Sequence, residues 1–481
     1  MEKYFFAEKG NGEIKVSGNL QAEFGSHDRV FAGWNWNGEN LTVTNDRYGF
    51  YPMFYAEDKG KFAVSPSLTK LIELGFSQDF DEDAFSVFLR FGWFIGEDTM
   101  FNSIRALPPS SVLTWQDGKL KISSKGIFTN KTSDISRGQA IKIYADLFQK
   151  AVEKTLPETG DFVVPLSGGR DSRHILFALN KANRKPAACL TILHPPPRPN
   201  EDAKIAARIC QTLGIKHQLL PQSDSRLDSE KRKNYLTGFS VFEHGWFLPL
   251  SDFVKGKRNI VYDGIAGDVL SAGLFLDEAR LRLFEEGKFE NLADKLMEAE
   301  GYLPALLTKE NYQRFSREKA IRHLIKELER HADAPNPVGS FYFWNRTRRC
   351  IAPSPFRLLP DSTEILMPYL DKDVFDFLSS LPARMLLDHN FHTETIAFAY
   401  PEYASIPYED KSSPPIMDTA HFRNYSREIL LYALTKRKKK LVNRNILLSR
   451  CLRGMFDSGY SRNVIDFGEL AIILLQLERL N

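Results

Sequence analysis

The chain has 481 residues, of which 43% are hydrophobic and 26% charged, with a formal net charge of +3. This length exceeds what one hydrophobic core usually serves, so two or three domains are expected. The small net charge gives no electrostatic reason to expect a nucleic-acid or membrane partner. The four cysteines form no C-x-x-C pair, which argues against a disulfide framework and against a zinc ribbon.

The first residues, MEKYFF, carry charge within three positions, and no run of about 18 apolar residues occurs anywhere. We therefore expect neither a signal peptide nor a membrane span, and a cytoplasmic location.

Residues 20–125 are predicted to be rich in β-strands. Short aromatic and β-branched runs alternate with hairpin signals, among them Asn37-Gly38 and Asp117-Gly118. A single helix is expected over residues 81–91. The polar segment that follows predicts a linker over residues 126–135, so the first domain is expected to cover residues 1–125.

From residue 136 the pattern changes to helices that alternate with short apolar strands. Ser136 is a candidate N-cap for a helix that ends before Pro157. Apolar strands are expected near residues 162–166, 187–193, 216–220 and 259–264, with amphipathic helices between them. This alternation predicts an α/β fold with a doubly wound parallel sheet over residues 136–481, mostly helical after about residue 275.

The sequence SGGRDS at residues 167–172, here the glycine loop, lies between a predicted strand and a predicted helix. Ligands of doubly wound sheets bind at the carboxyl ends of the strands, and a helix N-terminus attracts phosphate. Gly168 and Gly169 would let the backbone approach an anion closely, and Ser167 and Ser172 can donate hydrogen bonds.

Asp171 is the unusual member of this loop, because a carboxylate beside a polyphosphate repels it. A Mg²⁺ ion between the two would remove the repulsion, since that ion prefers carboxylate and phosphate oxygens. The alternative is a plain polar turn, which the flanking strand and helix disfavour. The sequence lacks G-x-x-x-x-G-K-[ST], so this is not the kinase-type P-loop.

The glycine loop resembles the S-G-G-x-D-S loop of the ATP pyrophosphatases, and the chain as a whole is similar to the asparagine synthetase family. That family includes β-lactam synthetases and lasso-peptide cyclases. Four further segments resemble family motifs in family order: residues 45–75, 96–115, 263–273 and 367–382. The resemblance implies a degenerate, truncated Ntn-type glutaminase-like domain followed by an ATP pyrophosphatase domain.

The resemblance also implies a reaction and its site. A carboxylate would attack the α-phosphorus of ATP to give an acyl-adenylate and pyrophosphate, and an amine would then displace AMP to form an amide. Family positions suggest Asp171 and Asp268 as Mg²⁺ ligands and Lys411 as the residue that stabilises charge at the α-phosphate. ATP would contact the glycine loop together with Leu166, Thr191 and Gly264.

Three positions depart from the family pattern. Glutamine-hydrolysing members need an N-terminal cysteine nucleophile, but Met1 stands there and the first cysteine is Cys189, so no glutamine hydrolysis is expected. Ile265 and Val269 replace acidic residues of asparagine-forming members, which argues against free aspartate as the substrate. Arg170 occupies a usually apolar position, and the sequence leaves its role open.

The main hypothesis is therefore an ATP-dependent amide-forming ligase that joins a carboxylate-bearing small molecule or peptide to an amine. Its variants are an ammonia-dependent asparagine synthetase, a lactam or macrolactam cyclase, and an enzyme that amidates another metabolite. The alternatives from other classes are a catalytically silent scaffold and a tRNA-modifying ATP pyrophosphatase. No membrane or nucleic-acid partner is expected, and a homodimer is compatible with the sequence.

Two segments and three histidines carry no functional signal in the sequence. Residues 194–199, HPPPRP, are interpreted as a rigid connector rather than a substrate entrance. The basic run at residues 436–440 is interpreted as a solvated helix face. His174, His389 and His392 show no metal-ligand spacing and are treated as ordinary residues.

Overall fold

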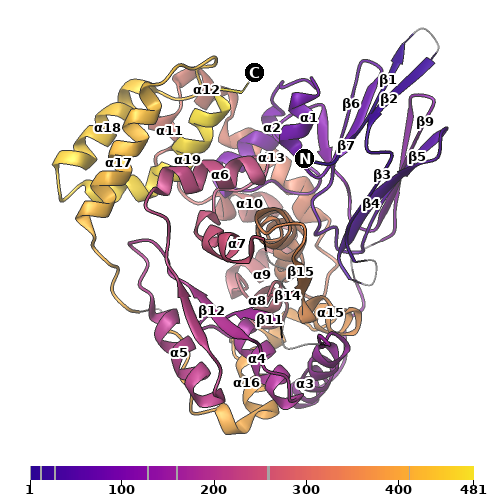
Figure 1. Cartoon of the computed structure of the whole chain (residues 1–481), viewed down its shortest axis with the longest axis vertical. Helices are drawn as coiled ribbons and strands as arrows, with labels where there is room; N and C mark the ends of the chain where they lie inside the picture. Colours follow the sequence, from indigo (N-terminus) through magenta and orange to yellow (C-terminus); the bar gives the residue numbers. More distant parts are fainter. Residues whose placement is uncertain are drawn as a thin grey trace.

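The structure is a computed structural model that describes residues 2–10, 13–26, 29–126, 129–158, 161–256, 260–410 and 412–480. Two regions divide it: a β-rich N-terminal part, and an α/β part with helices around a parallel sheet (Figure 1). Among the helices of these residues, none has the combination of length and apolar character that crossing a membrane requires.

Two five-stranded antiparallel sheets form the N-terminal part, in the orders β2-β1-β7-β6-β8 and β10-β9-β5-β4-β3. The bounds are β1 Phe5–Gly10, β2 Glu13–Gly18, β3 Gln21–Gly25, β4 Phe31–Trp36, β5 Asn40–Asn45, β6 Phe54–Asp58, β7 Lys61–Ser65, β8 Ile104–Ala106, β9 Ser111–Gln116 and β10 Lys119–Ser124, with helices α1 Leu68–Glu73 and α2 Glu82–Phe91.

Aromatic side chains fill the space between these two sheets. The rings of Phe62 and Trp115 stack with centroids 5.3 Å apart, and both side chains are almost completely buried. The β9–β10 hairpin turns at Asp117 and Gly118, where both residues have positive φ, as an Asp-Gly turn requires. The hairpins and helix α2, capped by Asp81, agree with the sequence prediction, whereas strands β1 and β2 lie before its β-rich segment.

The second part has a fully parallel sheet in the order β13-β12-β11-β14-β15. Its strands are β11 Phe162–Pro165, β12 Ala188–Ile192, β13 His217–Leu220, β14 Ile260–Tyr262 and β15 Glu364–Leu366, and its first helices are α3 Arg137–Lys154, α4 Asp171–Lys181, α5 Glu201–Leu213, α6 Arg226–Leu236, α7 Leu248–Val254 and α8 Gly267–Ser271. The α/β fold class predicted from the sequence is confirmed. Helix α3 begins at the predicted N-cap Ser136, and the side chain of Gln139 completes a capping box there.

Helices make up most of the chain beyond α8, as the sequence predicts. Their bounds are α9 Glu278–Glu285, α10 Phe289–Met297, α11 Leu303–Leu306, α12 Lys309–Arg314, α13 Arg317–Glu329, α14 Pro337–Tyr342, α15 Lys372–Ser379, α16 Phe391–Ala399, α17 Thr419–Leu434, α18 Arg444–Phe456 and α19 Val464–Leu477. The turns η1 Gly245–Phe247, η4 Pro368–Leu370, η5 Ala383–Met385, η6 Pro401–Tyr403 and η7 Ser461–Asn463 are 3₁₀-helical, whereas η2 Phe343–Ile351 and η3 Ser354–Leu358 are π-helical. Helices α17, α18 and α19 pack together at one end of the molecule (Figure 1).

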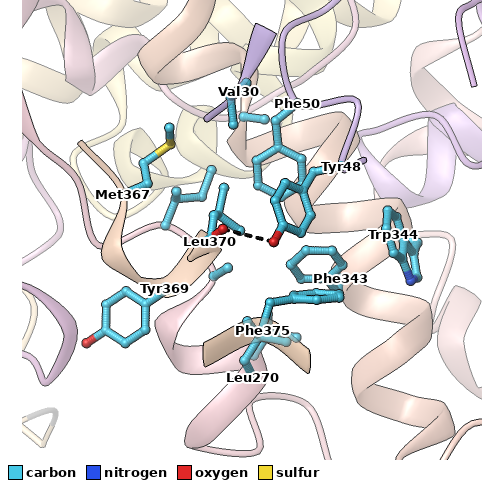
Figure 2. Packing of buried hydrophobic residues seen from close by; sticks show 14 of the residues in the cluster. Val30, Tyr48, Phe50, Leu270, Phe343, Trp344, Met367, Tyr369, Leu370 and Phe375 are labelled. Carbon is cyan, nitrogen blue, oxygen red and sulfur yellow. Dashed lines mark hydrogen bonds between the residues drawn. The ribbon is translucent and has the colours of Figure 1, made fainter. Parts of the chain in front are cut away.

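The two parts share a buried aromatic contact. Tyr48 and Phe50, between β5 and β6, pack against Phe343 and Phe375 of the α/β part (Figure 2). The Tyr48 hydroxyl donates a hydrogen bond of 2.9 Å to the carbonyl oxygen of Leu370. One continuous hydrophobic cluster therefore includes residues of both parts.

Candidate active site

The glycine loop joins the carboxyl end of β11 to the first turn of α4. A cavity of about 380 Å³, here the loop cavity, lies at this edge of the parallel sheet. Seven of the residues predicted from the sequence line it: Leu166, Ser167, Asp171, Ser172, Thr191, Gly264 and Asp268. Gly168 and Gly169 belong to the loop but are not among the lining residues, and Lys411 lies outside the described residues.

Hydrogen bonds within the chain hold the strand ends that form the cavity. The Leu166 N–H donates to the carbonyl oxygen of Leu190, and the Thr191 hydroxyl donates to the carbonyl oxygen of Leu166 at 2.7 Å. Thr191 also lies 2.8 Å from His217. Adjacent strand ends are thereby fixed to one another at the edge of the cavity.

The N–H groups of the glycine loop already have partners within the chain. Gly168 donates to the carboxylate of Asp202 at 2.6 Å, Gly169 donates to the Ser167 hydroxyl, and Ser167 donates to the Ser172 hydroxyl. Arg198 forms an ion pair with the same Asp202 at 3.1 Å. A phosphate that used the Gly168 N–H would therefore have to displace the Asp202 carboxylate, a contact that the loop sequence alone does not reveal.

Asp171 is packed against the loop that carries Asp268. A Cβ atom at Gly267 would lie 2.6 Å from Oδ1 of Asp171, and one at Gly264 would lie 2.8 Å from its Cβ. Glycine is needed at both positions because the Asp171 side chain occupies that space. The two glycines thus form a cradle for this carboxyl group.

The electrostatics of the two aspartates favour a bound cation. Burial and then the nearby Asp268 carboxylate raise the pKa of Asp171 well above its ordinary value. Within the described part of the chain, Oδ1 of Asp171 is buried and has no hydrogen-bond partner. Two close carboxylates with an unsatisfied oxygen suit Mg²⁺, which prefers oxygen ligands, so the residues present fit this ion. Burial also raises the pKa of Asp263, at the same edge, to about 6.

Arg173 connects the loop to the segment that leads toward Lys411. Its side chain is buried and donates hydrogen bonds to three carbonyl oxygens, those of Gly168, Ile406 and Pro407. Arg170, whose role the sequence leaves open, donates to Thr393 at 2.7 Å and does not line the cavity.

The wall of the loop cavity includes residues that sequence reasoning missed. The π-helical turns contribute Arg346, Thr347, Ile351 and Ser354, and the segment before α7 contributes His244 and Trp246. π-Helical turns are rare and often occur at functional sites. His194 and Arg198 of the HPPPRP segment, which the sequence indicates is a rigid connector, also line the cavity.

Two domain families match the sequence. A glutamine amidotransferase domain matches residues 26–125, and an asparagine synthase domain matches residues 144–231, which include the glycine loop. Together the two matches support the resemblance to the asparagine synthetase family that the sequence shows. The asparagine synthase match supports an ATP-dependent ligase.

Comparison with curated proteins gives no match. Among solved structures, similar chains include a glutamine PRPP amidotransferase from B. subtilis (12% identity, TM-score 0.15, covering 50% of this chain and 44% of that one). NMN synthetase from Francisella tularensis (15%, TM-score 0.19, 34% and 75%) and an allosteric regulatory enzyme of purine biosynthesis (12%, TM-score 0.15, 49% and 41%) are also similar. The chain spans less than half the length of the first and third, and at these TM-scores the similarities carry no functional meaning.

Proposed function

We propose that the chain is an ATP-dependent amide-forming ligase that adenylates a carboxylate and passes the acyl group to an amine. The acid's oxygen attacks the α-phosphorus of ATP, the bond to the β-phosphate oxygen breaks, and pyrophosphate leaves. The amine nitrogen then attacks the acyl carbon, loses a proton and displaces AMP.

The observation that carries this proposal is the position of the glycine loop and two crowded aspartates on one cavity, in a chain with an asparagine synthase domain. Asp171 and Asp268 would hold Mg²⁺, which when bound neutralises charge on the triphosphate and the leaving pyrophosphate. Leu166, Gly264 and Thr191, at the strand ends, would contact the nucleoside. The loop hydroxyls of Ser167 and Ser172 would donate to phosphate oxygens.

The acid would bind against the π-helical wall of the same cavity. Ser354 has a buried hydroxyl that lacks a hydrogen-bond partner among the described residues. Arg346 has one ion-pair partner in the described ranges, Glu243 at 3.3 Å, whose side chain is half exposed, so this pairing is weak. Ile265 lines the cavity where asparagine-forming members have a carboxylate, so this position offers no negative charge to bind the ammonium group of a free amino acid.

We further propose that the N-terminal part does not hydrolyse glutamine. Cysteine is the nucleophile of that reaction, and residues 1–188 contain none. The cysteines that follow are buried and have no exposed thiol to offer. The proposed role of the N-terminal part is structural, and the aromatic contact in Figure 2 supports this, because Phe50 packs against Phe343 of η2.

One experiment tests the reaction. Purified protein with ATP, Mg²⁺, an amine mixture and a panel of carboxylic acids should release pyrophosphate and AMP with at least one acid. Asp171→Asn, which keeps the shape but removes the charge, should abolish that release. ADP and phosphate as products would contradict adenylation, and no nucleotide consumption with any acid would favour the silent scaffold.

A further inference from the structure

Two buried histidines lie directly behind the glycine loop. His174 belongs to α4 and His392 to α16, and both side chains are 0% exposed. The His174 ring stacks on Phe148 of α3 with centroids 3.8 Å apart. These contacts fix both rings inside the protein, far apart in sequence but adjacent in space.

The polar atoms of the two rings form a chain that ends at Asp171. Nδ1 of His174 lies 3.1 Å from Nε2 of His392, and Nδ1 of His392 lies 3.5 Å from Oδ1 of Asp171. Tyr369 donates its hydroxyl proton to the backbone carbonyl of Asp171 at 3.1 Å. Across the described ranges, Nδ1 of His392 and Nε2 of His174 are buried and have no hydrogen-bond partner by the usual geometric limits.

The surroundings decide which nitrogens carry protons. Nε2 of His174 has no partner in the described ranges, so its proton is best placed on Nδ1, from which Nε2 of His392 accepts. The Tyr369 hydroxyl lies 3.3 Å from the same Nε2 but donates to the carbonyl oxygen of Asp171. A neutral imidazole has one proton, so that of His392 is on Nδ1, directed at Asp171. Nε2 of His174 is then unprotonated and leaves no buried donor unsatisfied.

Both rings are neutral in this arrangement. A charged pair would bury two like charges 3.1 Å apart, which is costly. These contacts fit a neutral chain of donors that runs from His174 through His392 to Asp171.

We propose that His392 is a positioning residue for Asp171 and that His174 fixes its tautomer. The N–H of His392 would donate to Oδ1 of Asp171, 3.5 Å away, and orient that oxygen, whose second lone pair stays available for the cation. Outer hydrogen bonds of this kind orient metal ligands and raise metal affinity. The inference rests on the metal role of Asp171 in the proposed function, but its test needs no turnover.

The test measures Mn²⁺ binding, as a paramagnetic substitute for Mg²⁺, by electron paramagnetic resonance with a non-hydrolysable ATP analogue present. His392→Leu removes the N–H and should weaken Mn²⁺ affinity about 10- to 100-fold. His392→Asn, whose amide N–H takes the place of Nδ1–H, should recover most of that loss. His174→Phe keeps the ring on Phe148 but frees the His392 tautomer, and should weaken affinity roughly threefold to tenfold.

His421→Leu in α17 is the control, because it makes the same replacement at a partly buried histidine among helices distant in sequence from the loop. It should bind Mn²⁺ as the wild type does. Equal affinity in wild type and a folded His392→Leu overturns the proposal. Equal weakening by His392→Leu and His392→Asn overturns it as well, since packing alone would then explain the loss. If His392→Leu does not fold, wild-type affinity in His174→Phe overturns the tautomer role.

The two proposals fail in different ways. A wild-type protein that binds Mn²⁺ and shows these variant effects, yet never consumes nucleotide, supports the positioning role and contradicts the proposed function. A wild-type protein that binds no Mn²⁺ with the analogue overturns both.

Discussion

Gly267→Ala probes the cradle around Asp171 more sharply than removal of the aspartate itself. Gly267 is the first residue of α8 and its φ is not positive, so the backbone accepts alanine. The added Cβ would lie 2.6 Å from Oδ1 and 2.7 Å from Cγ of Asp171, whereas ordinary contacts begin at 3.4 Å. The carboxyl group must therefore shift by about 0.8 Å, and such crowding costs about 1–3 kcal/mol.

A shift of this size moves Asp171 away from the position it needs to share a cation with Asp268. We expect Gly267→Ala to raise the Mg²⁺ concentration for half-maximal pyrophosphate release by about tenfold or more, since misplaced metal ligands cost 10- to 100-fold. The assay is pyrophosphate release across a Mg²⁺ titration at saturating ATP. Urea unfolding measured in parallel gives the change in stability.

Gly138→Ala is the matched control for this variant. Gly138 is exposed in the first turn of α3, and apart from its chain neighbours and the nearby backbone of its own helix, no atom of the described residues lies within 4 Å of the added Cβ. Alanine there should stabilise the protein by about 0.5–1 kcal/mol and leave the Mg²⁺ dependence unchanged. A wild-type Mg²⁺ dependence in Gly267→Ala would refute the reasoning about the cradle.

Three further variants test other parts of the account. In Arg173→Lys, the lysine cannot reach all three carbonyl acceptors of Arg173. The free energy of unfolding should therefore fall by about 1–3 kcal/mol, and pyrophosphate release should fall as well. An unchanged free energy of unfolding would contradict this. Arg346→Gln should raise KM for the acid about tenfold without changing KM for ATP, because its charge is proposed to meet the acid alone. Burial lowers the pKa of His323, but the hydrogen bond to Asp98 at 2.6 Å outweighs it and raises the pKa above 6.5. The pair therefore stabilises the fold fully below pH 6.5 and loses this effect as pH rises through the folded pKa, so His323→Gln should destabilise most at low pH in urea unfolding.

Local signals in the sequence were enough for most of the fold. The Asp117-Gly118 turn, the Ser136 cap and the four apolar runs of the parallel sheet each have a short-range physical cause, and the structure has them in the predicted places. Strand β15 escaped prediction because three residues, Glu364–Leu366, are too few to show a periodicity. Its pairing with β14 arises from tertiary contacts.

The candidate site, too, was predicted from the sequence only in part. A loop motif identifies residues that are adjacent in sequence, such as Ser167 and Asp171, and the resemblance of residues 263–273 to a family motif suggests Asp268. It cannot show that Asp202 accepts the Gly168 N–H or that His392 reaches Asp171, because those contacts join residues far apart along the chain. Histidine spacing carried no signal for the same reason, and the roles of the predicted site residues themselves stay predictions.

The most direct test of adenylation is to follow the oxygen atom. The acids that support pyrophosphate release are labelled with ¹⁸O in the carboxyl group, the reaction is run with an amine, and AMP is examined by mass spectrometry. If a carboxylate oxygen attacks the α-phosphorus, one ¹⁸O atom appears in the phosphate of AMP. Label found in inorganic phosphate, or AMP free of label beside a labelled amide, would contradict the mechanism.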